Sequence, residues 1–127
     1  FDLTDNIGNK KIEKSLEILD TLIYNKEPHQ KILITLYNHF KKLYLLKLHE
    51  NLHSNIDVVQ VLGLKPNQVF LVNKYKKQAM YFREEEIFNI INEFIDLDYK
   101  SKNGLMDIDV GIKANYVKIL KINIKIL

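Results

Sequence analysis

The longest helical pattern of apolar residues in the chain runs from Pro28 to about Leu52. Apolar residues recur there at i, i+3 and i+4, which is the spacing of one helix face. Proline suits the first helical position because it needs no backbone donor there. The apolar positions are Ile32, Leu33, Leu36, Tyr37, Phe40, Leu43, Tyr44, Leu45, Leu46 and Leu48. A stripe this wide is typical of a helix packed by neighbours on several sides, so we predict a central helix over 28–52.

Shorter amphipathic segments flank this stretch. The tight link over residues 25–27 predicts that the segment before it packs antiparallel to the central helix. Residues 121–127 alternate as a strand would, but we take them as helix because no partner strand precedes them. The predicted class is all-α, a single bundle of six or seven helices over residues 1–127. The predicted helices before that last stretch cover 1–7, 10–24, 28–52, 57–62, 67–81, 83–101 and 107–120.

Two of these helices carry predicted contacts. In the helix over 67–81, Val69, Val72 and Tyr75 are expected to face the helix over 57–62, and the run 70–72 is expected to pack. In the helix over 83–101, the predicted buried stripe is Ile87, Ile90, Ile91, Phe94 and Ile95.

Composition narrows the class of function. The chain has 127 residues, a formal charge of +3 and no cysteine, which excludes disulfides, a thiolate nucleophile and a cysteine-based zinc site. The positive charge comes almost entirely from lysine, since Arg83 is the sole arginine. No apolar run approaches the roughly 18 residues of a membrane span. The chain opens on Phe1 rather than methionine, so we expect a fragment of a longer protein.

The segment His49-Glu50-Asn51-Leu52-His53 matches the H-E-x-x-H pattern of zinc peptidases. Two histidines one turn apart would bind the metal, and Glu93 or a residue of 84–86 would supply the third ligand. The segment sits at the end of a helix, however, where histidine is favoured by the helix dipole. Surface histidines are therefore the preferred interpretation, and a zinc peptidase is the remote alternative.

Residues 57–81 resemble a helix-turn-helix, with Lys74, Lys76 and Lys77 as a basic cluster that would contact a DNA backbone. The start of the second helix offers Asn67 and Gln68 for base contacts. The lysines come late in that helix, where they would reach phosphate only. A nucleic-acid-binding module is thus an alternative function, and a structural helix pair is preferred. We find no glycine-rich phosphate loop, no Ser-His-Asp set and no paired carboxylates, so no catalytic residues and no cofactor or metal are expected.

Taken in order, several short motifs resemble one known family. Phe1 to Ile7, followed by Lys14-Ser15-Leu16 and Ile18-Leu19, is similar to its start; Glu27-Pro28 with Ile32-Leu33, Leu36, Phe40 and Leu43 is similar to its long central helix. Leu62-Gly63-Leu64-Lys65-Pro66, with Val69, Lys74, Gln78-Ala79 and Phe82, resembles its turn and the helix after it. Asp96, Asp98, Lys100 and Gly104 resemble the end of its penultimate helix. The family is the C-terminal domain of the delta subunit of the bacterial DNA polymerase III clamp loader.

The resemblance implies a collar domain, the C-terminal oligomerisation domain of a longer three-domain chain. Its partners would be the other clamp-loader subunits, the ATPase gamma or tau subunits and delta prime. The sliding clamp would be reached only through the N-terminal domains, DNA only indirectly, and no membrane is involved. The domain would be cytoplasmic and no enzyme, although the parent subunit belongs to the DNA polymerase III holoenzyme, a nucleotidyltransferase. The residues expected at subunit contacts are Tyr81, Phe82, Phe88, Ile119, Ile122 and Ile126.

Overall fold

A computed structural model of the chain describes residues 2–53, 55–108, 110–114 and 118. Within these ranges every regular element is a helix, which confirms the predicted all-α bundle. None of the described helices is both long enough and apolar enough to cross a lipid bilayer. The elements are α1 (Asp2–Gly8), α2 (Ile12–Tyr24), α3 (His29–Asn51), α4 (Val58–Val61), the short 3₁₀ helix η1 (Pro66–Gln68), α5 (Leu71–Ala79) and α6 (Glu84–Lys102).

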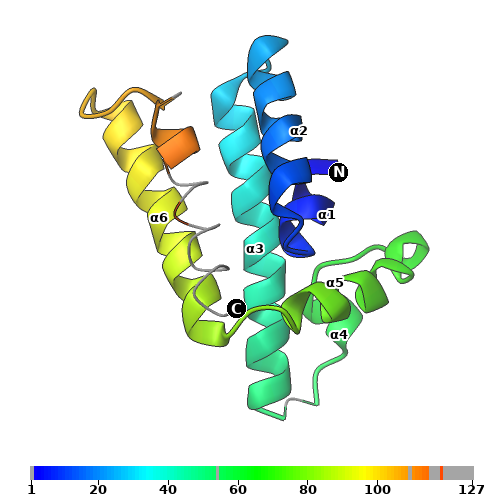
Figure 1. Ribbon diagram of the computed structural model, residues 1–127. Coiled ribbons are helices and arrows are strands. Elements are labelled where there is room, and N and C mark those ends of the chain that lie inside the picture. The colour runs from blue at the N-terminus through cyan, green and yellow to red at the C-terminus, as the bar shows by residue number, and fades with distance from the viewer. Residues whose placement is uncertain (1, 54, 109, 115–117, 119–127) are drawn as a thin grey trace.

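The predicted central helix is confirmed as α3, which has 23 residues and is therefore roughly 34 Å long. It lies in the middle of the bundle, with α6 on one side and α1, α2 and α5 on the other (Figure 1). Pro28 lies immediately before the first helical residue, His29, one position outside the helix that it was predicted to begin. The chain reverses direction just before it, so α2 and α3 are antiparallel, as expected (Figure 1).

Aromatic rings fill the middle of the core. Phe40 of α3 is completely buried, and its ring centroid lies 5.5 Å from that of Phe82 and 6.0 Å from that of Phe94. Because Phe94 belongs to α6 and Phe82 to the turn before it, these contacts attach α6 to the central helix. Buried aromatic pairs of this kind contribute about 0.5–1.5 kcal/mol beyond the apolar area that they bury.

The predicted helix over 67–81 is wrong at its start. Pro66 begins a short 3₁₀ turn in which the backbone N–H of Lys65 donates to the side-chain oxygen of Gln68 at 3.0 Å. The chain then turns again before α5 begins at Leu71. Val69 and Phe70 fall in this turn and are exposed, so neither packs on α4 as expected, whereas Val72 and Tyr75 are buried.

The buried stripe of α6 differs from the prediction at one position. Ile87, Ile90 and Phe94 are buried and Ile91 is partly buried against the core, but Ile95 is half exposed. The next buried residue is Leu97 instead, because it follows Phe94 by three positions and so stays on the same face of the helix.

Beyond α6, residues 108, 110–114 and 118 are helical, in agreement with a helix starting near Asp107. Lys113 pairs with Asp20 of α2 at 3.4 Å, and Lys118 pairs with Glu93 of α6 at 3.2 Å. This last described segment therefore links α2 to α6. The predicted helix over 121–127 and the expected contact residues Ile119, Ile122 and Ile126 lie outside the described residues.

Candidate interaction surface

The H-E-x-x-H segment does not present its histidines as a pair. The ring Nε2 of His49 donates to the carbonyl oxygen of Ile56 at 2.6 Å. His53 lies beyond the end of α3 with a φ of +49°, so it does not continue the helix from His49. Asn51 in turn donates to Glu84 at 2.8 Å. In the described part of the chain, no three His, Cys, Asp or Glu side chains are grouped as metal ligands.

The predicted basic cluster on α5 is divided by the fold. The ammonium group of Lys74 lies 2.9 Å from the carboxylate of Asp5 on α1, so its charge is turned toward the bundle. Lys76 and Lys77 are exposed in the last turn of α5. The three lysines therefore do not share one surface, and a helix-turn-helix reader is further disfavoured because α4 is only four residues long.

The predicted contact residues in the described chain have different environments. Phe82 is a core residue with 2% exposure, so the expectation that it contacts a neighbouring subunit is corrected. Tyr81, in the turn between α5 and α6, and Phe88 on α6 are both partly exposed. The ring of Phe88 lies 6.0 Å from that of Tyr44, which places it on the side of α6 that meets α3.

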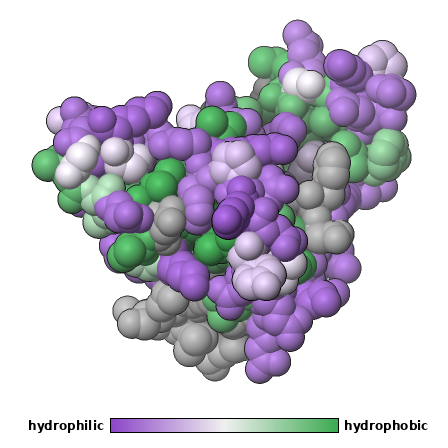
Figure 2. All heavy atoms as spheres, turned by 90° about the horizontal axis from the view of Figure 1, so that it is seen from above, coloured by the Kyte–Doolittle hydropathy of each residue, from purple (hydrophilic) through white to green (hydrophobic). Residues whose placement is uncertain are grey.

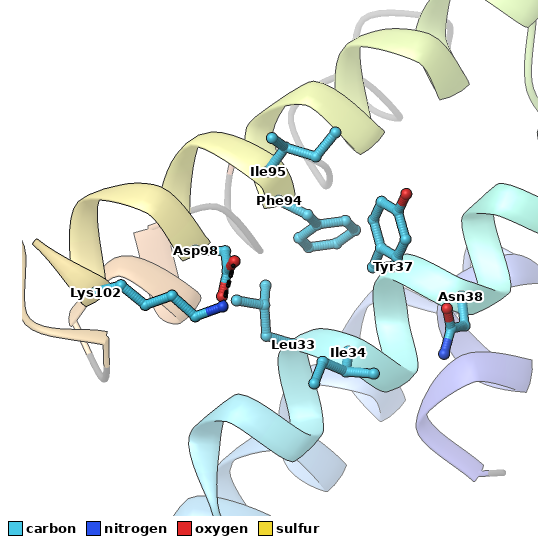
Figure 3. A pocket seen from close by; sticks show the side chains of 8 residues that line it. All are labelled: Leu33, Ile34, Tyr37, Asn38, Phe94, Ile95, Asp98 and Lys102. Atoms are coloured by element: carbon cyan, nitrogen blue, oxygen red, sulfur yellow. Dashed lines mark ion pairs between the residues drawn. The ribbon is translucent and has the colours of Figure 1, made fainter.

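A groove of about 380 Å³ runs between α3 and α6. Its floor is apolar, and the ion pair between Asp98 and Lys102, at 3.0 Å, stands at one end (Figure 3). Tyr37 and Phe94 lie across the groove from one another, each from its own helix (Figure 3). The lining residues are Leu33, Ile34, Tyr37, Asn38, Phe94, Ile95, Asp98 and Lys102.

Exposed apolar side chains continue the groove along α6. Phe88, Ile95 and Tyr99 are spaced by seven and four positions, which places them on one helix face. They span roughly 16 Å along the helix axis. Ile34 of α3 is 55% exposed on the other side of the groove. We refer to these four residues, with Tyr37 and Tyr44, as the α3–α6 face.

Seen from above the bundle, most of the surface is hydrophilic and the hydrophobic residues form separate patches (Figure 2). An apolar face flanked by polar residues is typical of a protein–protein contact. Of the α3–α6 face, the sequence predicted only Phe88 as a contact residue, because the helical period assigned Ile95 to the core and gave no signal for Ile34.

A buried polar group lies on the opposite side of α3. His39, which is 7% exposed, donates from Nε2 to the side-chain oxygen of Gln78 at 2.6 Å. The Gln78 amide reaches Asp5 at 3.5 Å, and Asp5 pairs with Lys74. Burial lowers the pKa of His39 to about 4, with smaller opposing effects of the Gln78 bond and Asp5. The sequence offered a signal for this residue, since His39 lies three positions after Leu36 and four before Leu43, on the buried face.

Comparison with known proteins gives a family match over most of the chain. The family described as "DNA polymerase III delta subunit, C-terminal domain" matches residues 1–119. The chain belongs to this family. The resemblance seen in the sequence motifs is thereby confirmed.

One curated relative of this delta-subunit domain is the DNA polymerase III subunit delta of Bacillus subtilis (strain 168), with 29% identity over 126 residues. The match covers 98% of the chain but only 35% of the relative, so the chain spans about a third of that protein's length. No solved structure gives a significant match.

Proposed function

We propose that this domain is the oligomerisation module of a clamp-loader delta subunit, which helps to assemble the complex that opens the sliding clamp and loads it on DNA. The observation that carries this proposal is the family match over residues 1–119 together with an apolar α3–α6 face that the described helices leave uncovered. The domain itself acts by binding and not by catalysis, and it works in the cytoplasm, where the clamp is loaded.

The α3–α6 face has the properties of a subunit contact. It combines aromatic rings with branched aliphatic residues, which are the side chains that contribute most to binding when they become buried. The ion pair Asp98–Lys102 and the side chain of Asn38 supply a polar margin. We propose that a neighbouring subunit, of the ATPase gamma or tau type or delta prime, covers this face through its own C-terminal domain.

The other residues that the sequence predicted to be functional have secondary roles in this proposal. Tyr81 extends the contact from the turn before α6, and the expected contributions of Ile119, Ile122 and Ile126 stay predictions. Lys76 and Lys77 are the exposed lysines that would approach a DNA backbone in the assembled loader. The sliding clamp would be engaged by the domains that precede this one in the longer chain.

The experiment is a pull-down of the full-length protein with the ATPase and delta-prime subunits of the same organism, followed by sizing chromatography. Ile95→Lys is expected to abolish or strongly weaken co-elution, because it places a charge in the middle of the face. The matched control is Phe70→Lys, which makes the same kind of change at another exposed apolar residue. Loss of assembly with the control and not with Ile95→Lys would show that the contact lies elsewhere. No co-elution of the unsubstituted protein with any loader subunit would reject the proposed function.

A further inference from the structure

A second concave site lies on the side of α3 away from the α3–α6 face. It has a volume of about 520 Å³ and is formed by α1, α3 and α5. Its lining includes three lysines, Lys31 and Lys42 from α3 and Lys74 from α5. None of these lysines lines the groove between α3 and α6; Asn38 borders both sites, but the lysine cluster lies outside the surface assigned to subunit contacts.

The charges at this site do not cancel. The residues that line the site include no carboxylate, and the nearby Asp5 of α1 is paired with Lys74 at 2.9 Å. Within the described ranges of the chain, no carboxylate lies within ion-pair distance of Lys31 or Lys42. Three ammonium groups against one carboxylate leave two positive charges without a counter-charge.

Two of the ammonium groups lie within cation–π range of the same buried ring. The Nζ atoms of Lys42 and Lys74 lie 5.8 Å and 5.6 Å from the ring centroid of Tyr75. Tyr75 is 6% exposed and therefore cannot turn away. The positive potential also reaches the wall of the site, since Lys74 and Lys42 both contribute to the lowered pKa of His39. A bound anion would offset the positive charge of the lysines that line this site.

Polar side chains complete the lining. The amide of Asn38 and the hydroxyls of Thr4 and Thr35 lie at the same site. Lysine acts as a point charge with rotatable donors, so it can contact the several oxygens of a phosphate. The volume exceeds by an order of magnitude the roughly 30 Å³ that a water molecule occupies in the liquid, so a phosphate with a substituent fits.

We propose that the pocket between α1, α3 and α5 is a phosphate-binding site, in which Lys31, Lys42 and Lys74 hold the anionic oxygens. The phosphate comes either from a small phosphate compound or from the phosphodiester backbone of a nucleic acid. The recognition chemistry is the same for both, because the groups that line the pocket contact the oxygens.

The test measures binding of two probes to the full-length protein that carries this chain. Inorganic pyrophosphate is titrated by calorimetry and a labelled single-stranded oligonucleotide by fluorescence anisotropy, both at constant ionic strength, because lysine–phosphate contacts are screened by salt. Lys42→Gln and, separately, the exposed Lys31→Gln are compared with Lys76→Gln, which removes the same charge elsewhere on the surface. Thermal unfolding of each variant shows that it is folded.

Lys42→Gln is expected to weaken binding of a probe about tenfold, the loss of one charge-assisted hydrogen bond, and Lys76→Gln is expected to leave it nearly unchanged. Weakening of pyrophosphate alone identifies a small phosphate compound as the ligand, and weakening of the oligonucleotide identifies a nucleic-acid backbone. The proposal is overturned if neither probe binds, or if Lys76→Gln weakens binding as much as Lys42→Gln and Lys31→Gln do. Neither outcome depends on subunit assembly, so failure here leaves the proposed oligomerisation untouched.

Discussion

The ring of His39 on α3 and the side chain of Gln78 on α5 share a buried hydrogen bond of 2.6 Å. Gln78 is completely buried, and its oxygen can only accept, so His39 carries its proton on Nε2. One contact therefore fixes the tautomer of the histidine and the position of α5 against the central helix. If either side chain is removed, the other loses its short hydrogen bond and stays buried.

Replacement of Gln78 by leucine should destabilise the domain by about 1–3 kcal/mol, because the Nε2–H of His39 then stays buried without an acceptor. Urea unfolding of the 127-residue chain, followed by circular dichroism, measures the change. Lys77→Leu, at the exposed neighbouring position, is the control and should change stability by less than about 0.5 kcal/mol. Equal effects of the two substitutions would mean that the buried bond contributes nothing.

Stability should fall in mild acid because of His39. The unfolded chain binds a proton near the usual pKa of 6.5, whereas the folded domain binds it only near pH 4. Stability contributed by the neutral ring is complete above pH 6.5 and is lost as the pH falls from there toward 4. Between pH 7 and pH 5 the loss is roughly 2 kcal/mol.

Urea midpoints measured at these two pH values test this prediction. His39→Gln should lose most of the pH dependence in that window, whereas His53→Gln, at an exposed position, should keep it. The charged groups that face His39 are Asp5, Lys42 and Lys74. A His39→Gln variant with the full pH dependence would assign the effect to another group.

Gly8 at the end of α1 should not tolerate a larger residue. A Cβ atom at this position would lie 2.0 Å from the side-chain oxygen of Gln78 and 3.0 Å from Nε2 of His39. Gly8→Ala should therefore cost about 1–3 kcal/mol by forcing α1 away from α5. Calorimetric unfolding of Gly8→Ala, Gln78→Ala and the double variant tests the cause. If steric overlap is responsible, the double variant is more stable than the sum of the single changes predicts.

Substitutions at Phe82 and Phe88 should have different effects, the first on folding stability and the second on subunit binding. Phe82→Ala removes a buried ring next to Phe40 and should cost about 3–5 kcal/mol of folding free energy. Phe88→Ala should change stability little but weaken binding to a neighbouring loader subunit roughly fivefold or more. Thermal unfolding and surface plasmon resonance on the same two proteins measure both quantities. Unchanged binding by Phe88→Ala would remove it from the contact.

The sequence predicted most of the helices because local pattern determines them. The apolar period and Pro28 placed α3, and the three glutamates at 84–86 placed the start of α6, where carboxylates suit the helix dipole. The start of α5 was wrong because the Gln68 side chain competes for a backbone N–H, and periodicity does not register such bonds.

Side-chain environments were harder to predict than helices. Phe82 and Phe88 lie on either side of the start of α6, yet Phe82 is in the core and Phe88 is on the surface. The difference depends on the direction of the chain in the turn before α6, which the local sequence does not reveal. Lys74 was grouped with its neighbours on α5, but its partner Asp5 lies far away in the sequence. Only the packing of α1 against α5 brings these two charges together, so no short motif reveals the pair or the lysine pocket beside it.

The central place of α3 has a consequence for synthesis on the ribosome. α1 and α2 leave the ribosome before α3 and can cover one of its sides at once. The other side is covered only after α6 has been synthesised, because Phe94 of α6, which contacts Phe40, follows it by 54 residues. At the usual rate of translation this delay lasts roughly 3 to 10 s, during which a strongly apolar surface is exposed in the nascent chain. The side of α3 that α6 covers in the folded domain is therefore open to contacts with other proteins until the last helices have been synthesised.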